Sequence, residues 1–344
     1  MERDILICAI ESSCDDTSAA VLKGRQVLSN VIADQDIHKS FGGVVPELAS
    51  RAHQQNILPI VGTAIERAKV PADAIQAVAF TAGPGLMGSL LVGASFARGM
   101  AIARSIPAYG IHHMRAHVLA HFIEDAHPAP PSFPFICLTV SGGHTQLVRV
   151  DGPRDFNIIG QTIDDAAGEA FDKTAKMLGL PYPGGPEVDL RSKMGNPTAF
   201  SFSKPRVEGF NFSFSGLKTS ILYFLQKQSR KHPGFIEENL NDLCASIQRH
   251  IVEILMDKLK AVAQHTGLRQ IALAGGVAAN SGLREALEEA AAQNNWEIFI
   301  PPLRYCTDNA AMIGICAALD MEAGLLPSDE TVAARKPLVK DQDR

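Results

Sequence analysis

Two histidines and one aspartate have the residue types and spacing of a metal site. In HHMRAH, His113 and His117 stand at i and i+4, so a helix places both imidazoles on one face. Asp308 in CTDNAAMIG adds a carboxylate, and two histidines with one carboxylate form a common site for iron(II) or zinc. Each part has another interpretation: histidine pairs occur without metal, and Asp308 before an apolar helix is placed like an N-cap.

A metalloprotease is the weaker interpretation of the histidine pair. A zinc protease needs Glu directly after the first histidine, and position 114 is Met. The chain has no G-x-S-x-G sequence and no cysteine in a protease signature, so acyl-enzyme chemistry lacks a visible nucleophile.

A glycine-rich segment, TAGPGLMGSL, matches G-x-G-x-x-G with Gly83, Gly85 and Gly88 between an expected strand and an expected helix. A dinucleotide fold needs a carboxylate about 20 residues further on, but the next one after Gly88 is Glu124. A P-loop is excluded because Ser89 and Leu90 follow the last glycine. Turn glycines at a close-packed helix start are the favoured interpretation.

Paired glycines follow two further expected strands, in SGGHT (141–145) and AGGVAANSGLR (274–284). Such pairs let backbone N–H groups approach an anion closely, although many are simple turns. Together with the polar turn SSCDDT (12–17) they favour a nucleotide held between two lobes. Asp172 lies on an expected amphipathic helix, where Lys173 and Lys176 are alternative partners for its carboxylate.

The elements that must position these residues alternate between strands and helices. Apolar runs flank a polar turn twice, in 4–22 and 135–150, which predicts two β-hairpins and a duplicated lobe. Strands at 74–81 and 271–276 alternate with helices at 54–67, 89–105, 240–265 and 281–294, which predicts partly parallel sheets. We expect a lobe connection in Pro-rich 127–134, functional loops in 181–215 and a frayed tail after Pro327.

Composition is that of a globular protein with two packed lobes: 344 residues, 46% hydrophobic and 20% charged. The apolar stretch Ile5 to Ile10 is too short for a signal peptide, its flank carries acidic Glu2 and Asp4, and no run reaches the ~18 apolar residues of a membrane span. Six scattered cysteines without a C-x-x-C pair indicate reduced thiols. We therefore expect a soluble cytoplasmic protein, and its net charge of −5 argues against non-specific coating of nucleic acid.

Taken in order, these motifs resemble those of one family. IESSCDDT, TAGPGLMGSL, HHMRAH, VSGGHTQL, DDAAGEAFDK, YPGGP, FSFSGLK, AGGVAAN and YCTDNAAMI match the series of the TsaD family, which was historically labelled a glycoprotease, and span positions 10–314. The resemblance implies an actin-like (sugar kinase and Hsp70-like) α/β fold of two duplicated lobes with a nucleotide cleft between them. The lobes would be 1–126, completed by a C-terminal helix at about 308–330, and 135–307 with helical insertions, followed by a tail at 331–344.

The resemblance also implies an activity. The threonylcarbamoyl group of threonylcarbamoyl-AMP would pass to the exocyclic amine of the tRNA adenosine beside the anticodon, releasing AMP. His113, His117 and Asp308 would hold one divalent metal, iron(II) or zinc, and Asp15 is the candidate for orienting or deprotonating the amine. The donor contacts would be Thr139, Val140, Ser141, Gly142, Gly143, Asp172, Gly185, Asp189 and Asn280. Implied partners are tRNA, a TsaB-like paralogous subunit, a TsaE-like ATPase and a separate enzyme that makes the donor, with no membrane.

One departure from the family pattern lies inside the histidine motif. The family commonly has Glu-Gly between the two metal histidines, whereas this chain has Arg115 and Ala116. The ligand spacing is unchanged, so we expect metal binding to survive. Two other functions fit the same fold. One is an ATP-dependent small-molecule kinase or ATPase, and the other is a nucleotide-binding partner subunit without catalysis of its own, in which the metal merely holds the lobes together.

Overall fold

The computed structural model describes residues 5–33, 43–327 and 331–338. The chain forms two compact units, and each unit is assembled from more than one segment. Unit 1 is Met1–Pro131, Gly152–Phe156 and Pro301–Arg344, and unit 2 is Ser132–Asp151 and Asn157–Ile300. The division after Pro131 falls within the Pro-rich segment 127–134. Glu2 and Asp4 lie outside the described residues.

Unit 1 is built on a five-stranded sheet in the order β3-β2-β1-β4-β5. β1 pairs antiparallel with β2, β2 pairs antiparallel with β3, and β1, β4 and β5 run parallel. The bounds are β1 Leu6–Glu11, β2 Thr17–Lys23, β3 Gln26–Ala33, β4 Ala77–Gly83 and β5 Ala108–His112. The predicted first hairpin is confirmed, and β3 extends it by a strand that the sequence analysis did not predict.

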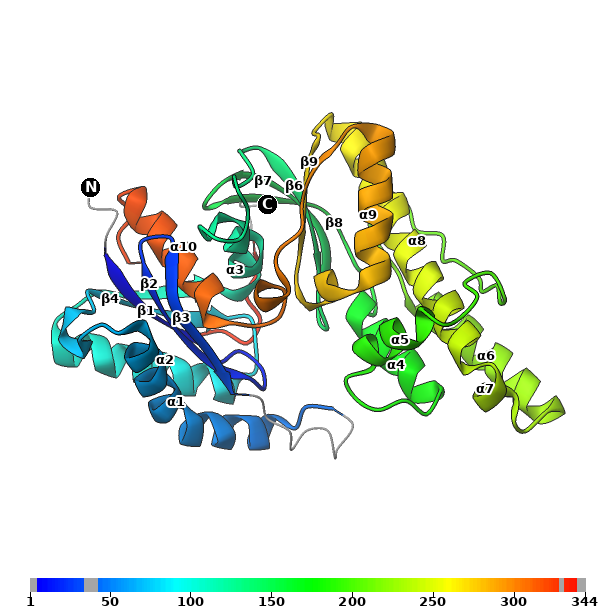
Figure 1. Ribbon diagram of the computed structural model, residues 1–344, viewed down its shortest axis with the longest axis horizontal. Helices are drawn as coiled ribbons and strands as arrows, with labels where there is room; N and C mark the ends of the chain where they lie inside the picture. The colour runs from blue at the N-terminus through cyan, green and yellow to red at the C-terminus, as the bar shows by residue number, and fades with distance from the viewer. Residues whose placement is uncertain (1–4, 34–42, 328–330, 339–344) are drawn as a thin grey trace. The chain divides into compact units, whose positions relative to one another are not determined.

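Helices cover both faces of this sheet (Figure 1). α1 (Pro46–Ala68) and α2 (Met87–Arg104) pack on each other along one face, and α10 (Ala310–Glu322) packs on β1 and β2 along the other. α10 is buried from Ala310 to Asp320, and Gly314 permits this approach because a Cβ there would lie 2.2 Å from Leu22. The shorter helices are α3 His113–Leu119, η2 Ala72–Ala74, η3 Ala120–Phe122 and η5 Leu303–Tyr305.

Unit 2 repeats the strand plan of unit 1, since its sheet has the order β10-β9-β6-β7-β8. A hairpin of β6 and β7 again lies beside parallel β9 and β10, so the predicted second hairpin is confirmed. The strands are β6 Phe135–Val140, β7 Thr145–Gly152, β8 Asp155–Gln161, β9 Gln270–Ala274 and β10 Glu297–Phe299. The helices are α4 Ala167–Met177, α5 Gly184–Ser192, α6 Ser215–Lys231, α7 Phe235–Glu238, α8 Leu240–Thr266, η4 Gly276–Ala279 and α9 Ser281–Asn294.

Two sequence predictions differ from the structure. The stretch 181–215 contains α5 as well as loops, because its Gly-Gly-Pro opening starts a helix that packs on α4 and α8. The tail after Pro327 is not frayed throughout, because Ala333 N donates to Ala82 O and Gly85 N donates to Ala334 O. Residues 328–330 and 339–344 lie outside the described residues. Within the described ranges, no helix has the length and apolar character needed to cross a bilayer.

Candidate functional site

The histidine pair lies on α3, which starts directly after the carboxyl end of β5. The ring of His112 caps the helix, since its Nδ1 accepts hydrogen bonds from Met114 N at 3.2 Å and Arg115 N at 3.4 Å. The cap fixes the first turn, and the i, i+4 spacing then places His113 and His117 together with ring centroids 4.7 Å apart. Both residues are buried, at 8% and 2% exposure.

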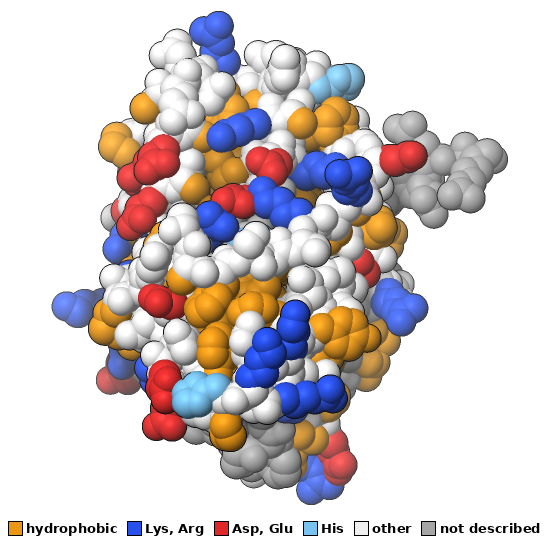
Figure 2. Space-filling view, turned by 90° about the vertical axis from the view of Figure 1, so that its right-hand side faces the viewer, with side chains coloured by type: hydrophobic (Ala, Val, Ile, Leu, Met, Phe, Trp, Pro, Cys, Tyr) orange, Lys and Arg blue, Asp and Glu red, His pale blue; other side chains and the backbone are white. Residues whose placement is uncertain are grey.

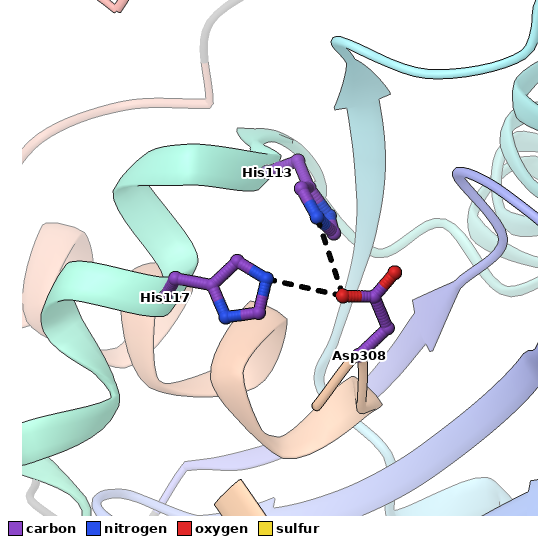
Figure 3. Close-up of side chains that lie close together, drawn as sticks. All are labelled: His113, His117 and Asp308. Atoms are coloured by element: carbon purple, nitrogen blue, oxygen red, sulfur yellow. Dashed lines mark hydrogen bonds and ion pairs between the residues drawn. The ribbon is translucent and has the colours of Figure 1, made fainter. Parts of the chain in front are cut away.

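Asp308 reaches the two histidines from the segment before α10 (Figure 3). Its Oδ1 lies 3.4 Å from Nε2 of His113 and 3.1 Å from Nε2 of His117. The N-cap of α10 is Asn309, whose side chain accepts from Met312 N at 3.0 Å. The N-cap interpretation of Asp308 is therefore wrong, because its neighbour caps the helix and Asp308 faces the imidazoles.

A buried carboxylate at the end of β1 orients His113 from behind. Nδ1 of His113 lies 3.2 Å from Glu11 Oε2 and 3.2 Å from Ser13 Oγ. Glu11 is fully buried and also accepts from Thr81 Oγ1 at 2.6 Å and from Ser13 N at 2.6 Å. Such a carboxylate–histidine pair fixes the ring and leaves the opposite nitrogen for a ligand. Glu11 thus directs Nε2 of His113 toward Asp308.

The charged groups in this cluster shift one another's pKa values. Burial alone lowers the pKa of His113, but the carboxylates of Asp308 and Glu11 outweigh it and hold that pKa well above its usual range. Burial alone raises the pKa of Asp308, but the two histidines hold that pKa well below its usual range. Burial likewise raises the pKa of Glu11, and His113 reverses the effect to a net lowering. The cluster therefore favours positive charge near His113 and negative charge on both carboxylates.

The donor set fits a divalent metal. One ligand atom from each of His113, His117 and Asp308 lies within 4.8 Å of the others. Two imidazoles and one carboxylate, without thiolate, suit iron(II) and zinc alike. The Asp308 side chain is 30% exposed, which keeps the cluster reachable from solvent. These three residues were predicted as ligands from the sequence, and the structure brings them together.

The predicted donor contacts gather in unit 2 around the ends of β6 and β9. Asp172 Oδ1 accepts from Gly184 N at 2.8 Å and from Gly185 N at 3.3 Å. Partners other than Lys173 and Lys176 therefore hold its carboxylate, and burial raises its pKa. Asp189 Oδ1 accepts from Ser281 Oγ at 2.7 Å, and Asn280 caps α9 by accepting from Leu283 N at 2.9 Å.

The two glycines after β6 have open space around them. Thr139 and Val140 end the strand as buried residues, whereas Gly142 and Gly143 are exposed and a Cβ on either would meet nothing within 4 Å. In contrast, a Cβ on Gly168 at the start of α4 would lie 2.6 Å from Ser141 O. The turn at Ser141 is thus packed on one side and open at its glycines.

The glycines of TAGPGLMGSL serve close packing instead. A Cβ at Gly85 would lie 2.4 Å from Ser13 O, and one at Gly83 would lie 2.1 Å from Ala333 O. Gly88 faces Ser50 in the same way, at 3.0 Å. The structure supports the interpretation of this segment as turn glycines at a close-packed helix start.

Comparison with known proteins decides the family. The family model described as TsaD, tRNA N6-adenosine threonylcarbamoyltransferase, matches residues 26–315. A protein of that description from Riemerella anatipestifer is 56% identical over 331 residues, covering 96% of this chain and 97% of its own length. One from Syntrophotalea carbinolica is 48% identical and covers 98% of each chain. The chain belongs to the TsaD family. Its reaction is accordingly transfer of a threonylcarbamoyl group to N6 of an adenosine in tRNA, and it is an acyltransferase.

Solved structures identify the fold at much lower identity. T. kodakarensis HypF superposes with a TM-score of 0.64 at 14% identity, covering 95% of this chain and 50% of that chain. The activator of 2-hydroxyisocaproyl-CoA dehydratase from Clostridium difficile gives a TM-score of 0.51 at 15% identity, covering 93% and 96%. With the repeated strand order of the two units, these similarities show the predicted two-lobed actin-like α/β fold.

Arg115, which departs from the TsaD pattern, has a partner in the structure. Arg115 is buried, at 8% exposure, and its guanidinium forms a bidentate ion pair with Asp320 on α10, with Nη1 3.0 Å from Oδ2. Arg154 donates to the same carboxylate from Nε at 2.9 Å and Nη2 at 2.7 Å. Arg115 Nε also donates to Pro153 O at 2.7 Å. This arginine therefore links α3 to α10 and to the segment 152–156.

Sequence reasoning missed two residues that support the TsaD site: Glu11 and Asp320. Glu11 ends an apolar strand, and a carboxylate in that position is a recognisable signal of a buried polar role. Asp320 follows ten consecutive apolar residues or glycines in α10 and carried the same signal. Asp15, the predicted catalytic residue, lies in the β1–β2 turn two residues after Ser13, in unit 1 with the histidines and Asp308.

Proposed function

We propose that this TsaD-family chain uses threonylcarbamoyl-AMP as its donor, modifies the tRNA adenosine beside the anticodon, and acts in the cytoplasm with one divalent iron or zinc per subunit. The observation that carries the proposal is the convergence of His113, His117 and Asp308 on one point.

The chemistry requires an activated carbamoyl group and a positioned amine, since the exocyclic amine of adenosine is a poor nucleophile. The amine nitrogen attacks the carbamoyl carbon, the bond from that carbon to the phosphate oxygen breaks, the amine loses a proton, and AMP leaves. A bound divalent ion would supply Lewis-acid polarisation of a donor oxygen. In this proposal the carboxylate of Asp15 orients the amine and accepts its proton.

The donor's nucleotide is assigned to unit 2. The open space at Gly142 and Gly143 supports contact between their backbone amides and a phosphate. Backbone amides engage Oδ1 of Asp172, which leaves Oδ2 to accept a hydrogen bond from a ribose hydroxyl. Other donor contacts are proposed for Thr139, Val140, Ser141, Gly185, Asp189 and Asn280.

The proposed partners are a TsaB-like subunit and a TsaE-like ATPase. A partner-binding surface in unit 1 is proposed on helix α2. Its apolar side chains Met87, Leu91 and Ile102 are 44%, 48% and 80% exposed. The rest of α2 packs in the core through Leu90, Ala94 and Ala97, which are buried.

The test is transfer of labelled threonine from pre-formed threonylcarbamoyl-AMP to tRNA, with the partner proteins supplied. We expect label in tRNA with the wild type and a loss of at least about 100-fold with His113→Ala. Asn309→Ala is the matched control, since it removes a helix cap beside the cluster but no ligand atom. Failure of the wild type to label tRNA, or full activity of His113→Ala, would refute the proposal.

The role of Asp15 needs its own measurement. We expect Asp15→Asn to lower kcat with tRNA and donor both saturating, while metal content stays at the wild-type level. Unchanged turnover at saturation would remove Asp15 from the mechanism and leave the metal proposal standing.

A further inference from the structure

Helix α6 presents an exposed face that the reaction described above does not use. Its buried side consists of Leu217, Ile221 and Leu225, which follow an i, i+4, i+8 spacing. On the opposite side, Tyr223 is 64% exposed. Lys227 follows at i+4, Arg230 at i+7 and Lys231 at i+8, so these cations share the face of Tyr223. This set of four residues is called the α6 face.

The charge of the α6 face is uncompensated. Helix α6 contains no Asp or Glu along its length. Its fourth cation, Lys218, is paired with Asp165 at 2.8 Å, but Lys227, Arg230 and Lys231 have no carboxylate partner in the part of the chain that the structure describes. The neighbouring Glu238 is engaged by His232 at 2.8 Å. Figure 2 shows one group of Lys and Arg side chains in its lower half, at the level where α6 and α7 lie in Figure 1, and others in its upper half.

A purely structural explanation covers only part of this arrangement. Arg230 and Lys231 lie in the last turn, where cations complement the helix dipole. A helix arranged for that purpose would also carry acids in its first turn, and α6 has none. Nor does the dipole account for an exposed tyrosine among the cations. The α6 face matches RNA better than it matches a protein partner. RNA phosphates are bound by cations, and unpaired RNA bases stack on aromatic rings such as that of Tyr223.

We propose that the α6 face contacts the tRNA substrate, with the three cations on backbone phosphates and the Tyr223 ring against an unpaired base. The inference rests on the tRNA transfer function of the family. In a chain of net charge −5, a local basic face also gives the polyanionic substrate a defined place to dock. Phosphate contacts supply affinity and register, and the aromatic ring distinguishes a loop from a duplex.

The cations are tested with the triple variant Lys227→Glu, Arg230→Glu and Lys231→Glu. The control carries the same charge change on exposed cations elsewhere, as Arg67→Glu, Lys69→Glu and Lys260→Glu. Affinity for fluorescent tRNA is measured by anisotropy over a salt series, and transfer is measured with all partners present. We expect the α6 triple variant to weaken binding at least about 10-fold and to reduce the salt slope by about two, with KM for tRNA raised and kcat kept. Equal affinity and slope for the two triple variants would overturn the proposal.

Tyr223 is tested separately because stacking does not depend on salt. Tyr223→Ala should weaken tRNA binding several-fold without changing the salt slope. Tyr223→Phe keeps the aromatic ring and should bind tRNA as tightly as the wild type does. Leu190→Ala is the control, since Leu190 is 59% exposed in the same unit. Equal losses for Tyr223→Ala and Leu190→Ala would refute the stacking contact.

Two further outcomes separate this proposal from the transfer function. Variants that keep their affinity for tRNA but lose transfer in the assay that contains the partner proteins would show that the α6 face binds a protein, which overturns the RNA assignment. A wild type that labels tRNA in the same assay shows that the transfer function stands, whichever way the α6 variants behave.

Discussion

Arg115 on α3 and Asp320 on α10 form an ion pair in which the side chains are only 10% and 2% exposed. α3 carries both histidines of the candidate metal centre, and α10 begins two residues after Asp308. The pair therefore joins the two segments that bring the ligands together. A buried pair of this kind is strongly destabilising to break, because the remaining charge stays buried without its partner.

Asp320→Asn should lower the free energy of unfolding by about 3 kcal/mol, since it leaves Arg115 and Arg154 facing each other without a carboxylate. The matched control is Glu322→Gln on the same helix, whose ion pair with Arg25 is 37% and 30% exposed and contributes about 0.5 kcal/mol. Urea unfolding of the metal-free proteins measures both. Similar losses in the free energy of unfolding for the two variants would show that the buried ion pair contributes no more than the exposed one.

Asp308 and Asn309 are adjacent, yet the structure gives them different roles, and substitution should separate these. Asp308→Ala should abolish tight metal binding, because it removes one of the three proposed ligands. Asn309→Ala should keep the metal and cost about 1 kcal/mol of stability through the lost helix cap. Metal analysis after dialysis and thermal unfolding report the two effects. Equal metal content in both variants would contradict the assignment.

Sequence reasoning reached the architecture because local patterns determine it. Alternating apolar runs around a polar turn predicted both hairpins, and helix α9 has the predicted bounds Ser281–Asn294. The i, i+4 spacing predicted the histidine pair for the same reason, since one helix positions both rings. Asp308 joined the ligand set only in combination with that pair and the family resemblance.

Contacts between distant segments were beyond prediction from one sequence. Glu11 and His113 are separated by 102 positions, and Arg115 and Asp320 by 205. Neither pair leaves a periodic signal, because each depends on how strands and helices pack. The strands β3 and β8 were also missed, since their burial alternates and weakens the apolar pattern that marked their neighbours.

Glu11 should tune the metal centre without binding the metal itself. Glu11→Gln keeps the side-chain size but removes the negative charge beside Nδ1 of His113. We expect metal affinity to fall about 10- to 100-fold, as is usual when the carboxylate behind a histidine ligand is lost. Competition with a chromophoric chelator measures this change. Glu322→Gln is the control, since it removes an acid elsewhere in the same unit. If Glu11→Gln and Glu322→Gln had equal metal affinity, Glu11 would have only a packing role.

The same added methyl group should have different effects at two glycines near Ser141. Gly168→Ala places a Cβ 2.6 Å from Ser141 O, so the backbone must move and stability should fall by about 1–3 kcal/mol. Gly142→Ala meets nothing within 4 Å and should leave stability unchanged, but its Cβ occupies the space through which a phosphate would approach. Thermal unfolding and AMP binding by calorimetry distinguish the effects. We expect Gly142→Ala to weaken AMP at least several-fold, and undiminished AMP binding by this variant would remove the glycine turn from the donor site.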